Sequence, residues 1–164
     1  MINITPFTKP YEDQVIDLIV SIQAKEFGVS ITADDQPDLR NIASYYQKGL
    51  GEFWLAIDGS EVLGTIALVD IGNQQTALRK MFVKDGYRGK PLSIGQNLMD
   101  TLQTTCDNKG IKEIYLGTVP NYYAAHRFYE KNGFERISES DLPNNFQIMG
   151  VDKYFYKKVV GSVL

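Results

Sequence analysis

One glycine-rich, basic loop holds the residues of this sequence that are best suited to chemistry. The loop runs from Lys84 to Gln96, between an apolar strand and an amphipathic helix, and it includes Arg88 and Lys90. Ser93 and Gln96 match the S-x-x-Q capping box, which predicts a helix that starts at Ser93 with free backbone amides. Glycines let a ligand approach the backbone closely, and a helix start favours negative charge. The loop therefore predicts a phosphate or pyrophosphate site, although a solvated surface loop has a similar composition.

Two common phosphate loops do not fit this spacing. The P-loop requires G-x-x-x-x-G-K-[ST], whereas here a proline follows the lysine, and the G-x-G-x-x-G fingerprint is absent. A serine hydrolase elbow fits better, because residues 91–95 lack only the first glycine of G-x-S-x-G. Asp107 and His126 follow Ser93 in the order of a catalytic triad. The long polar loop before Ser93 argues against an elbow, so a hydrolase that uses Ser93 is kept as a minor alternative.

A second group of residues lies on one face of a helix predicted over 121–132. Ala125, Phe128, Tyr129 and Asn132 share that face, and Gly133 follows its end. The residues by themselves give no special role to Tyr129, which is one of ten tyrosines. Packing against a sheet is its ordinary role.

Composition excludes several classes of protein. The chain has 164 residues, of which 43% are apolar, so we expect one domain over 1–164. A net charge of −3 argues against a nucleic-acid partner. The longest apolar run, Phe53 to Ile57, is far below the ~18 residues of a membrane span, so we expect a cytoplasmic protein without a membrane partner. A single Cys and a single His cannot supply a four-ligand zinc site from nitrogen and sulfur donors. This count leaves a carboxylate-only metal site open, and we expect no metal. We expect Cys106 in the core and His126 at the surface.

The predicted elements form an α/β (α+β) frame in the order β-α-α-β-β-β-α-β-α-β-β. This order indicates a mixed sheet of about six to seven strands with about four helices, in which strands 76–83 and 113–118 are parallel neighbours. Turns at 58–60 and 72–73 join three strands into a meander. Strand 2–6 is expected at an edge because Pro6 cannot donate to a ladder. The last strand, 154–160, is also expected at an edge, where it is able to pair across a homodimer.

Together these features resemble the GNAT superfamily of N-acetyltransferases. The resemblance is carried by Y-R-G-K at 87–90, I-G-Q-N-L-M at 94–99 and A-H-R-F-Y-E-K-N-G-F at 125–134. It implies a GNAT-like single-domain fold in which strands 76–83 and 113–118 separate and acyl-CoA lies between them. It also implies acetyl-CoA as the donor and a small-molecule or peptide amine as the acceptor, with direct attack in a ternary complex.

The resemblance gives roles to particular residues. The backbone of Met81 and Val83 would pair with the pantetheine arm, loop amides would bind the pyrophosphate, and Tyr129 would protonate the departing thiolate. Free thiols have a pKa near ~8.5 and phenols near ~10, so a modest loss of rate is expected when Tyr129 is removed. The residues implied to bind CoA are Met81, Phe82, Val83, Arg88, Gly89, Lys90, Ser93, Ile94, Gly95, Gln96, Ala125, Phe128 and Tyr129.

The family's phosphate-loop pattern, [Q/R]-x-x-G-x-[G/A], fits this sequence in two ways. One alignment starts at Arg88 and requires a two-residue insertion. The other starts at Lys90, with Lys in place of Arg and Ser93 in place of Gly. Either alignment leaves the helix start in place.

The residues do not identify a general base. The glutamate that many family members carry on the central strand falls here on Ala77. Glu26, Glu52 and Asp70 remain candidates, and each is also typical of a surface carboxylate. These departures keep a second hypothesis open, a CoA-binding but catalytically weak sensor or interaction module.

Overall fold

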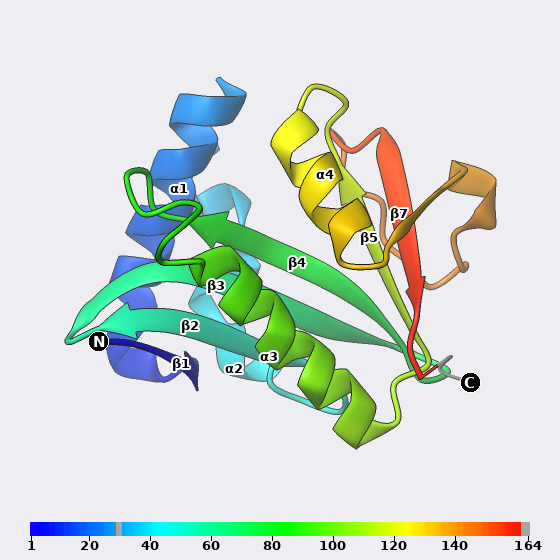
Figure 1. The fold of residues 1–164 in the computed structure, drawn as a ribbon, viewed down its shortest axis with the longest axis horizontal. Helices are drawn as coiled ribbons and strands as arrows, with labels where there is room; N and C mark the ends of the chain where they lie inside the picture. The colour runs from blue at the N-terminus through cyan, green and yellow to red at the C-terminus, as the bar shows by residue number, and fades with distance from the viewer. Residues whose placement is uncertain (29–30, 162–164) are drawn as a thin grey trace.

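The computed structural model describes residues 1–28 and 31–161, which fold around one sheet with the strand order β1-β2-β3-β4-β5-β7-β6 (Figure 1). Its neighbouring strands are antiparallel except for the parallel pair β4 and β5. The mixed sheet and the predicted order of elements are therefore confirmed. The strands are β1 (Ile2–Pro6), β2 (Glu52–Asp58), β3 (Glu61–Gly72), β4 (Gln75–Val83), β5 (Glu113–Thr118), β6 (Glu135–Ile137) and β7 (Tyr154–Val159).

Helices cover both faces of the sheet. In Figure 1, α3 and α4 lie on one face, and α1 and α2 lie on the other. The helices are α1 (Glu12–Phe27), α2 (Ile42–Tyr45), α3 (Ile94–Lys109) and α4 (Tyr123–Lys131). Short 3-10 turns are η1 (Lys9–Tyr11), η2 (Ala33–Asp35), η3 (Pro37–Arg40) and η4 (Glu139–Asp141).

The predicted meander of β2, β3 and β4 is confirmed, and its turns follow from residue type. Gly59 joins β2 to β3 at φ 62°, a left-handed angle that glycine adopts without steric cost. Gly72 and Asn73 begin the next turn at φ 92° and 57°. β1 lies at one edge of the sheet, as expected from Pro6.

The segment after Pro37 does not form the continuous helix that its residues predict. Leu39, Ile42 and Tyr46 have helical spacing, and Gly49 is a predicted left-handed stop. The segment forms the 3-10 turn η3 and then the single-turn helix α2. The three apolar residues are buried, so the predicted face is correct. Gly49 is left-handed, but it lies beyond the helix end at Tyr45.

The expectation that the last strand is an edge strand is wrong. β7 lies between β5 and β6 and pairs with both, and Phe155 and Tyr156 are buried. The more apolar strand takes the interior position, and three-residue β6 takes the edge. β7 therefore offers no free edge for a homodimer.

The core has a part on each side of the sheet. The larger cluster joins α3 to the sheet, and Leu98, Leu102 and Cys106 belong to it. Cys106 is fully buried, which confirms its predicted core position. A second cluster packs Val15 and Ile19 of α1 against β2. Among the described residues, no helix is both long and apolar enough to span a membrane.

Candidate active site

The parallel strands β4 and β5 pair over only a short stretch and then diverge. Their register joins Gln75, Thr76 and Ala77 to residues 113–115, and no described residue of β4 after Ala77 pairs with β5. Figure 1 shows the two strands side by side at one end and apart at the other, where α4 begins. A one-residue bulge accompanies this change: Lys80 has φ 54°, and Thr65 Oγ1 donates to its carbonyl at 2.6 Å.

The divergence leaves backbone groups of β4 without a strand partner. Lys84 N donates to Leu63 O of β3 at 2.8 Å, so its amide points toward β3. Because amides alternate in direction along a strand, the amides of Val83 and Met81 point the other way, toward the divergence. Phe82 points its side chain to the face of α1, where it packs with the second core cluster.

The start of α3 presents three backbone amides near the end of β4. Ser93 N donates to Gly89 O and Asn97 N to Ser93 O, whereas the amides of Ile94, Gly95 and Gln96 have no partner among the described residues. Three free amides at the positive end of a helix dipole are suited to an anion. The predicted capping box is wrong, because Ser93 is left-handed at φ 52° and its side chain makes no cap hydrogen bond.

The conformation of Ser93 bears on the two alignments of the loop. A non-glycine residue at φ 52° occupies a position that favours glycine. The alignment that starts at Lys90 places Ser93 where the family pattern has glycine. The backbone therefore favours that alignment.

Contacts at Gly95 hold α3, α4 and β4 together. A β-carbon at this position would lie 3.2 Å from Met81 Cε and 3.9 Å from the ring of Phe128. Gln96, instead of capping its helix, exchanges hydrogen bonds with Asn132 at 2.8 and 3.2 Å. The loop and the helix that carries Tyr129 are thus joined by packing and by a side-chain pair.

Tyr129, on α4, is buried in the larger core cluster, and its hydroxyl bonds to no described residue. The residue is 7% exposed, and Phe134 and Tyr156 pack against its ring. Every fully buried side-chain N or O atom in the described part of the chain has a hydrogen-bond partner. The Tyr129 hydroxyl has no such partner in residues 1–28 and 31–161, so it must reach solvent. Burial, and then the negative charge of Asp152, raise the pKa of Tyr129 above the ordinary phenol value.

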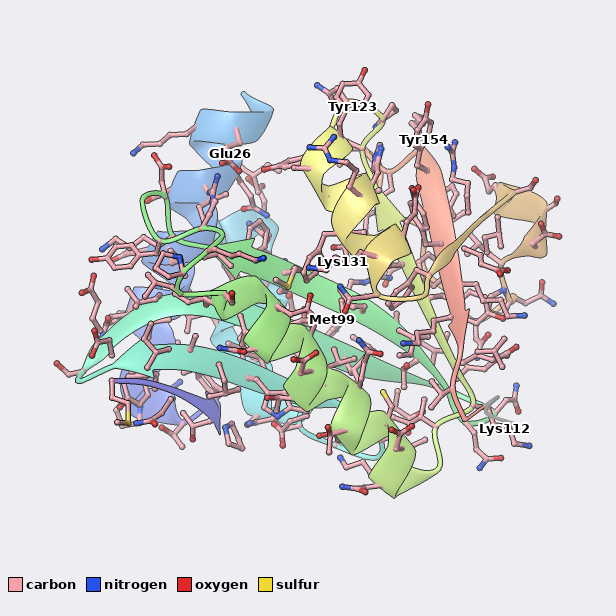
Figure 2. The ribbon with its side chains drawn as sticks, viewed as in Figure 1. Glu26, Met99, Lys112, Tyr123, Lys131 and Tyr154 are labelled. Atoms are coloured by element: carbon pink, nitrogen blue, oxygen red, sulfur yellow. The ribbon has the colours of Figure 1, made fainter. Side chains whose placement is uncertain are left out.

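Arg88, a predicted CoA ligand, forms an ion pair with Glu26 of α1. Its Nε also donates to Val83 O at 2.8 Å, and the Tyr122 hydroxyl donates to the same Glu26 carboxylate. Figure 2 labels Glu26 near the end of α1. Glu26 therefore holds together the ends of α1, the loop and α4, whereas Gly89 and Lys90 are exposed.

The other two base candidates serve loops at the opposite end of the sheet. Asp70 accepts hydrogen bonds from Leu50 N at 3.0 Å and from Gly72 N at 2.9 Å. Glu52 accepts from Gln47 and from the amide of the residue that follows it. Both carboxylates therefore accept hydrogen bonds within the fold. They lie at the other end of the strands from the start of α3.

The three residues of the hydrolase alternative do not come together in one site. Ser93 precedes α3 and Asp107 lies near its end, so fourteen residues at ~1.5 Å each separate them by about 21 Å. His126 is buried, contrary to the surface position expected, and its Nε2 lies 2.9 Å from Val119 O. Tyr123 and Tyr154, labelled in Figure 2, flank its ring.

Sequence reasoning did not identify two charged residues at the divergence, Arg79 and Asp152. Arg79 lies on β4, its Nη2 donates to Gln147 O at 2.8 Å, and its guanidinium lies 4.7 Å from the centre of the Phe146 ring. A β-carbon on Gly117 of β5 would lie 2.6 Å from Asp152 Oδ2, so the glycine makes room for this carboxylate. Arg79 could have been identified from the sequence, because it is a charged residue inside an apolar strand. Asp152 could not, because the loop that carries it has no periodic pattern.

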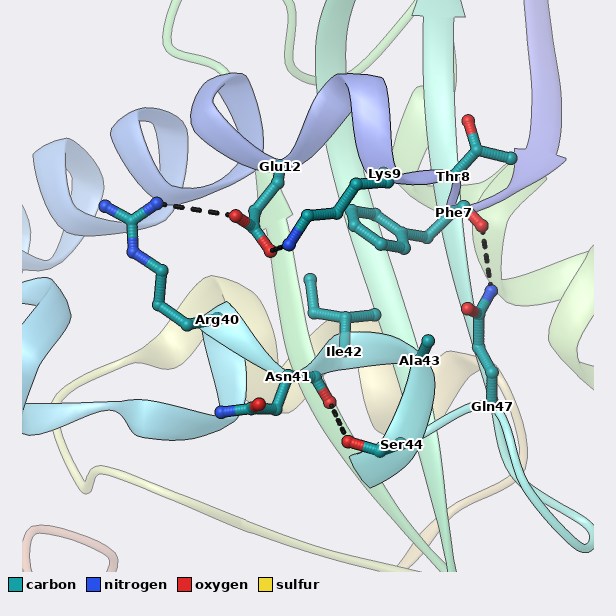
Figure 3. A pocket seen from close by; sticks show the side chains of 10 residues that line it. All are labelled: Phe7, Thr8, Lys9, Glu12, Arg40, Asn41, Ile42, Ala43, Ser44 and Gln47. Atoms are coloured by element: carbon teal, nitrogen blue, oxygen red, sulfur yellow. Dashed lines mark hydrogen bonds and ion pairs between the residues drawn. The ribbon is translucent and has the colours of Figure 1, made fainter.

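A pocket between the start of α1 and α2 lies elsewhere (Figure 3). Its charged residues satisfy one another, because Glu12 pairs with Lys9 at 2.8 Å and with Arg40 at 3.4 Å. None of the predicted CoA-binding residues lines it.

Comparison with known proteins gives a consistent result. A family model described as an acetyltransferase (GNAT) domain matches residues 49–136, more than half of the chain. A GNAT-family acetyltransferase from Staphylococcus aureus Mu50 is 43% identical with a TM-score of 0.92, covering 98% of this chain and 99% of that chain. An acetyltransferase from Streptococcus agalactiae is 30% identical with a TM-score of 0.91, covering 97% and 98%.

A curated relative is longer than this chain. N-acetylaspartate synthetase from Danio rerio is 31% identical over 108 residues, which make up 63% of this chain. The same match covers 37% of the relative, so the chain corresponds to well under two thirds of its length.

Proposed function

Because the chain belongs to the GNAT family of acetyltransferases, we propose that it moves an acetyl group from acetyl-CoA to a primary amine by direct attack in a ternary complex. The acetyltransferase domain spans residues 1–164. The observation that carries the proposal is the divergence of β4 from β5 after Ala77, with three free amides at the start of α3 against the end of β4.

The chain offers unpaired groups that suit the donor. The amides of Ile94, Gly95 and Gln96 would hold the pyrophosphate, and those of Met81 and Val83 would hold the pantetheine arm as an added strand holds a sheet edge. CoA supplies the activated acyl group as a thioester. The protein therefore needs to orient the donor and manage protons, and needs no nucleophile of its own.

Tyr129 acts near the sulfur as a hydrogen-bond donor. Its raised pKa makes complete proton transfer to a thiolate unfavourable, because a thiol has a pKa near ~8.5. A phenol that stays protonated still stabilises a developing negative charge by donating to it. Its hydroxyl is free to do so, since no described residue bonds to it.

Calorimetric titration of CoA into the purified protein tests donor binding, and thiol release across a panel of amines tests transfer. We expect CoA to bind and at least one amine to release thiol. No binding at millimolar CoA would refute the proposal. Tight binding without thiol release from any amine would instead favour the sensor hypothesis, for which the alanine at position 77 is the motivating feature.

A further inference from the structure

We propose that the acceptor is a primary amine that also carries a carboxylate, with Arg79 holding the carboxylate and Asp152 receiving the amine. This inference rests on the proposed function and names the substrate class of the same site. It follows from two charged side chains of opposite sign that meet at the divergence of β4 and β5, on the sheet face away from α3.

Arg79 is fixed in place but keeps most of its hydrogen-bonding capacity. One bond to Gln147 O and the stack on Phe146 orient the guanidinium. A guanidinium has five N–H donors in a planar fork. Within residues 1–28 and 31–161, no carboxylate forms an ion pair with Arg79 and no other acceptor bonds to it, so donors remain for a ligand carboxylate.

The adjacent Lys80 shows the contrast. Its Nζ lies 3.4 Å from Asp38 Oδ2 and donates to Gln36 Oε1 at 2.6 Å. The Tyr46 hydroxyl donates to the same Asp38 carboxylate at 2.6 Å. Lys80 is therefore paired by direct contact within the protein. Partly buried Arg79 makes no ion pair in residues 1–28 and 31–161, and the Asp152 carboxylate opposes its charge only from beyond ion-pair distance. A partly buried cation without a direct partner favours an anionic ligand.

Asp152 is the complementary group. Two backbone hydrogen bonds hold this part of the loop in place. Asp152 N donates to Met149 O at 3.0 Å, and Lys153 N donates to Thr118 O at 3.1 Å. Its carboxylate rests against Gly117 and accepts no hydrogen bond from the described part of the chain. A half-buried carboxylate with free lone pairs suits an ammonium group.

Asp152 is also electrostatically coupled to Tyr129. The Arg79 guanidinium of β4 acts on the Asp152 carboxylate, and the charge of Asp152 in turn raises the pKa of Tyr129 on α4. Burial raises the pKa of Asp152, and the Arg79 guanidinium partly offsets that rise. A carboxylate with a raised pKa is a better proton acceptor than a surface one.

The proton transfers balance with these residues. The ammonium of the acceptor gives one proton to Asp152, and the neutral nitrogen forms a bond to the acetyl carbon while the C–S bond breaks. The departing thiolate, held by the Tyr129 hydroxyl, takes the second proton of the attacking nitrogen through solvent. Asp152 then releases its proton to water, which leaves the N-acetylated acid, CoA thiol and one proton.

Matched pairs of acceptors test the inference. We would measure kcat/KM for leucine, phenylalanine, lysine and β-alanine against the carboxamide of each, and titrate the same compounds into CoA-loaded and unliganded protein. A carboxamide keeps the amine and the size but loses the negative charge. We expect a preference of about 10- to 100-fold for at least one acid, which is typical of hydrogen bonds to a charged group.

Variants assign the preference to residues. Arg79→Gln should bring the acid-to-amide ratio to about 1, whereas Arg136→Gln, which removes a cation stacked on Tyr154 of β7, should leave it unchanged. Asp152→Asn should lower kcat by about 100-fold and keep both the ratio and the affinity for CoA. Asp17→Asn, at an exposed position of α1, is the matched control.

The outcomes separate this inference from the proposed function. Equal use or equal binding of acids and carboxamides overturns the inference. A preference for the acid that survives in Arg79→Gln also overturns it. In both cases amine acetylation, the proposed function, still stands. Failure of every acid to bind either form of the protein also overturns it. Preferential binding of an acid without thiol release supports the acceptor site and refutes the transferase proposal.

Discussion

Replacing Tyr129 with phenylalanine removes one hydroxyl and leaves the packing of the ring on Phe134 and Tyr156 in place. Because no described residue bonds to that hydroxyl, its loss breaks no hydrogen bond of the folded protein. The free energy of unfolding should therefore stay nearly constant. Any effect on rate would then come from the reaction itself.

The size of the rate effect follows from the role that the structure allows. In the proposed role, Tyr129 donates a hydrogen bond to the developing thiolate, because its raised pKa disfavours complete proton transfer. A hydrogen bond to a charged group contributes about 1.5–3 kcal/mol, so kcat should fall by about 10- to 100-fold. The affinity for CoA should not change, because the bond strengthens only as charge develops on sulfur.

Steady-state thiol release, CoA calorimetry and thermal unfolding measure these three quantities. Tyr156→Phe is the matched control, since the Tyr156 hydroxyl donates to Glu130 at 2.8 Å. That change should cost about 1 kcal/mol of stability and lower Tm by roughly 2–4 °C with little effect on kcat. A Tyr129→Phe protein with kcat within twofold of the wild type would refute the assigned role. A fall in kcat that tracks a fall in Tm would make the role structural.

Three further predictions concern the loop and the core. Ser93→Gly should stabilise the fold by about 1 kcal/mol in urea unfolding, because a left-handed residue with a β-carbon is strained; a loss of stability would show that the serine side chain contributes more than the strain costs. Glu26→Gln should tighten CoA binding by up to about fivefold in calorimetry, because Arg88 would be freed for phosphate and a half-exposed ion pair is worth about 0.2–1 kcal/mol; weaker binding would contradict this. Burial raises the pKa of the Cys106 thiol to about 12, whereas the thiol of the unfolded chain has a pKa near ~8.5. Between these two pH values the thiol ionises in the unfolded chain but not in the folded one, so the free energy of unfolding should fall by up to about 1.4 kcal/mol per pH unit. Cys106→Ala should flatten that slope, and an unchanged slope would place its origin in another group.

Local pattern was enough to predict most elements of the fold. The unbroken apolar run at 53–57 predicts a buried strand, and the apolar spacing of Val15, Ile19 and Ile22 predicts a buried helix face. These residues are buried in the structure. Turn glycines such as Gly59 mark positions where few other residues fit. These signals depend on neighbours in sequence, so they needed no tertiary information.

The sequence could not predict the position of β7, because strand order depends on which surfaces compete for the interior of the sheet. It also could not predict that Ser93 fails to cap its helix, since the conformation at Ser93 is set by the loop that enters α3. Partners distant in sequence, such as Arg88 and Glu26, were likewise not detectable.

The sequence by itself determined the frame, the loop proposed to bind phosphate and the face of the helix that carries Tyr129. Each is a contiguous segment, so the spacing of its residues reflects its geometry. Only the tertiary structure decided which charges meet at the divergence of β4 and β5. Arg79 and Asp152 are 73 residues apart in the chain, and the carboxylate is placed by a loop that returns across Gly117. Contacts of that kind arise from packing, and no local spacing encodes them.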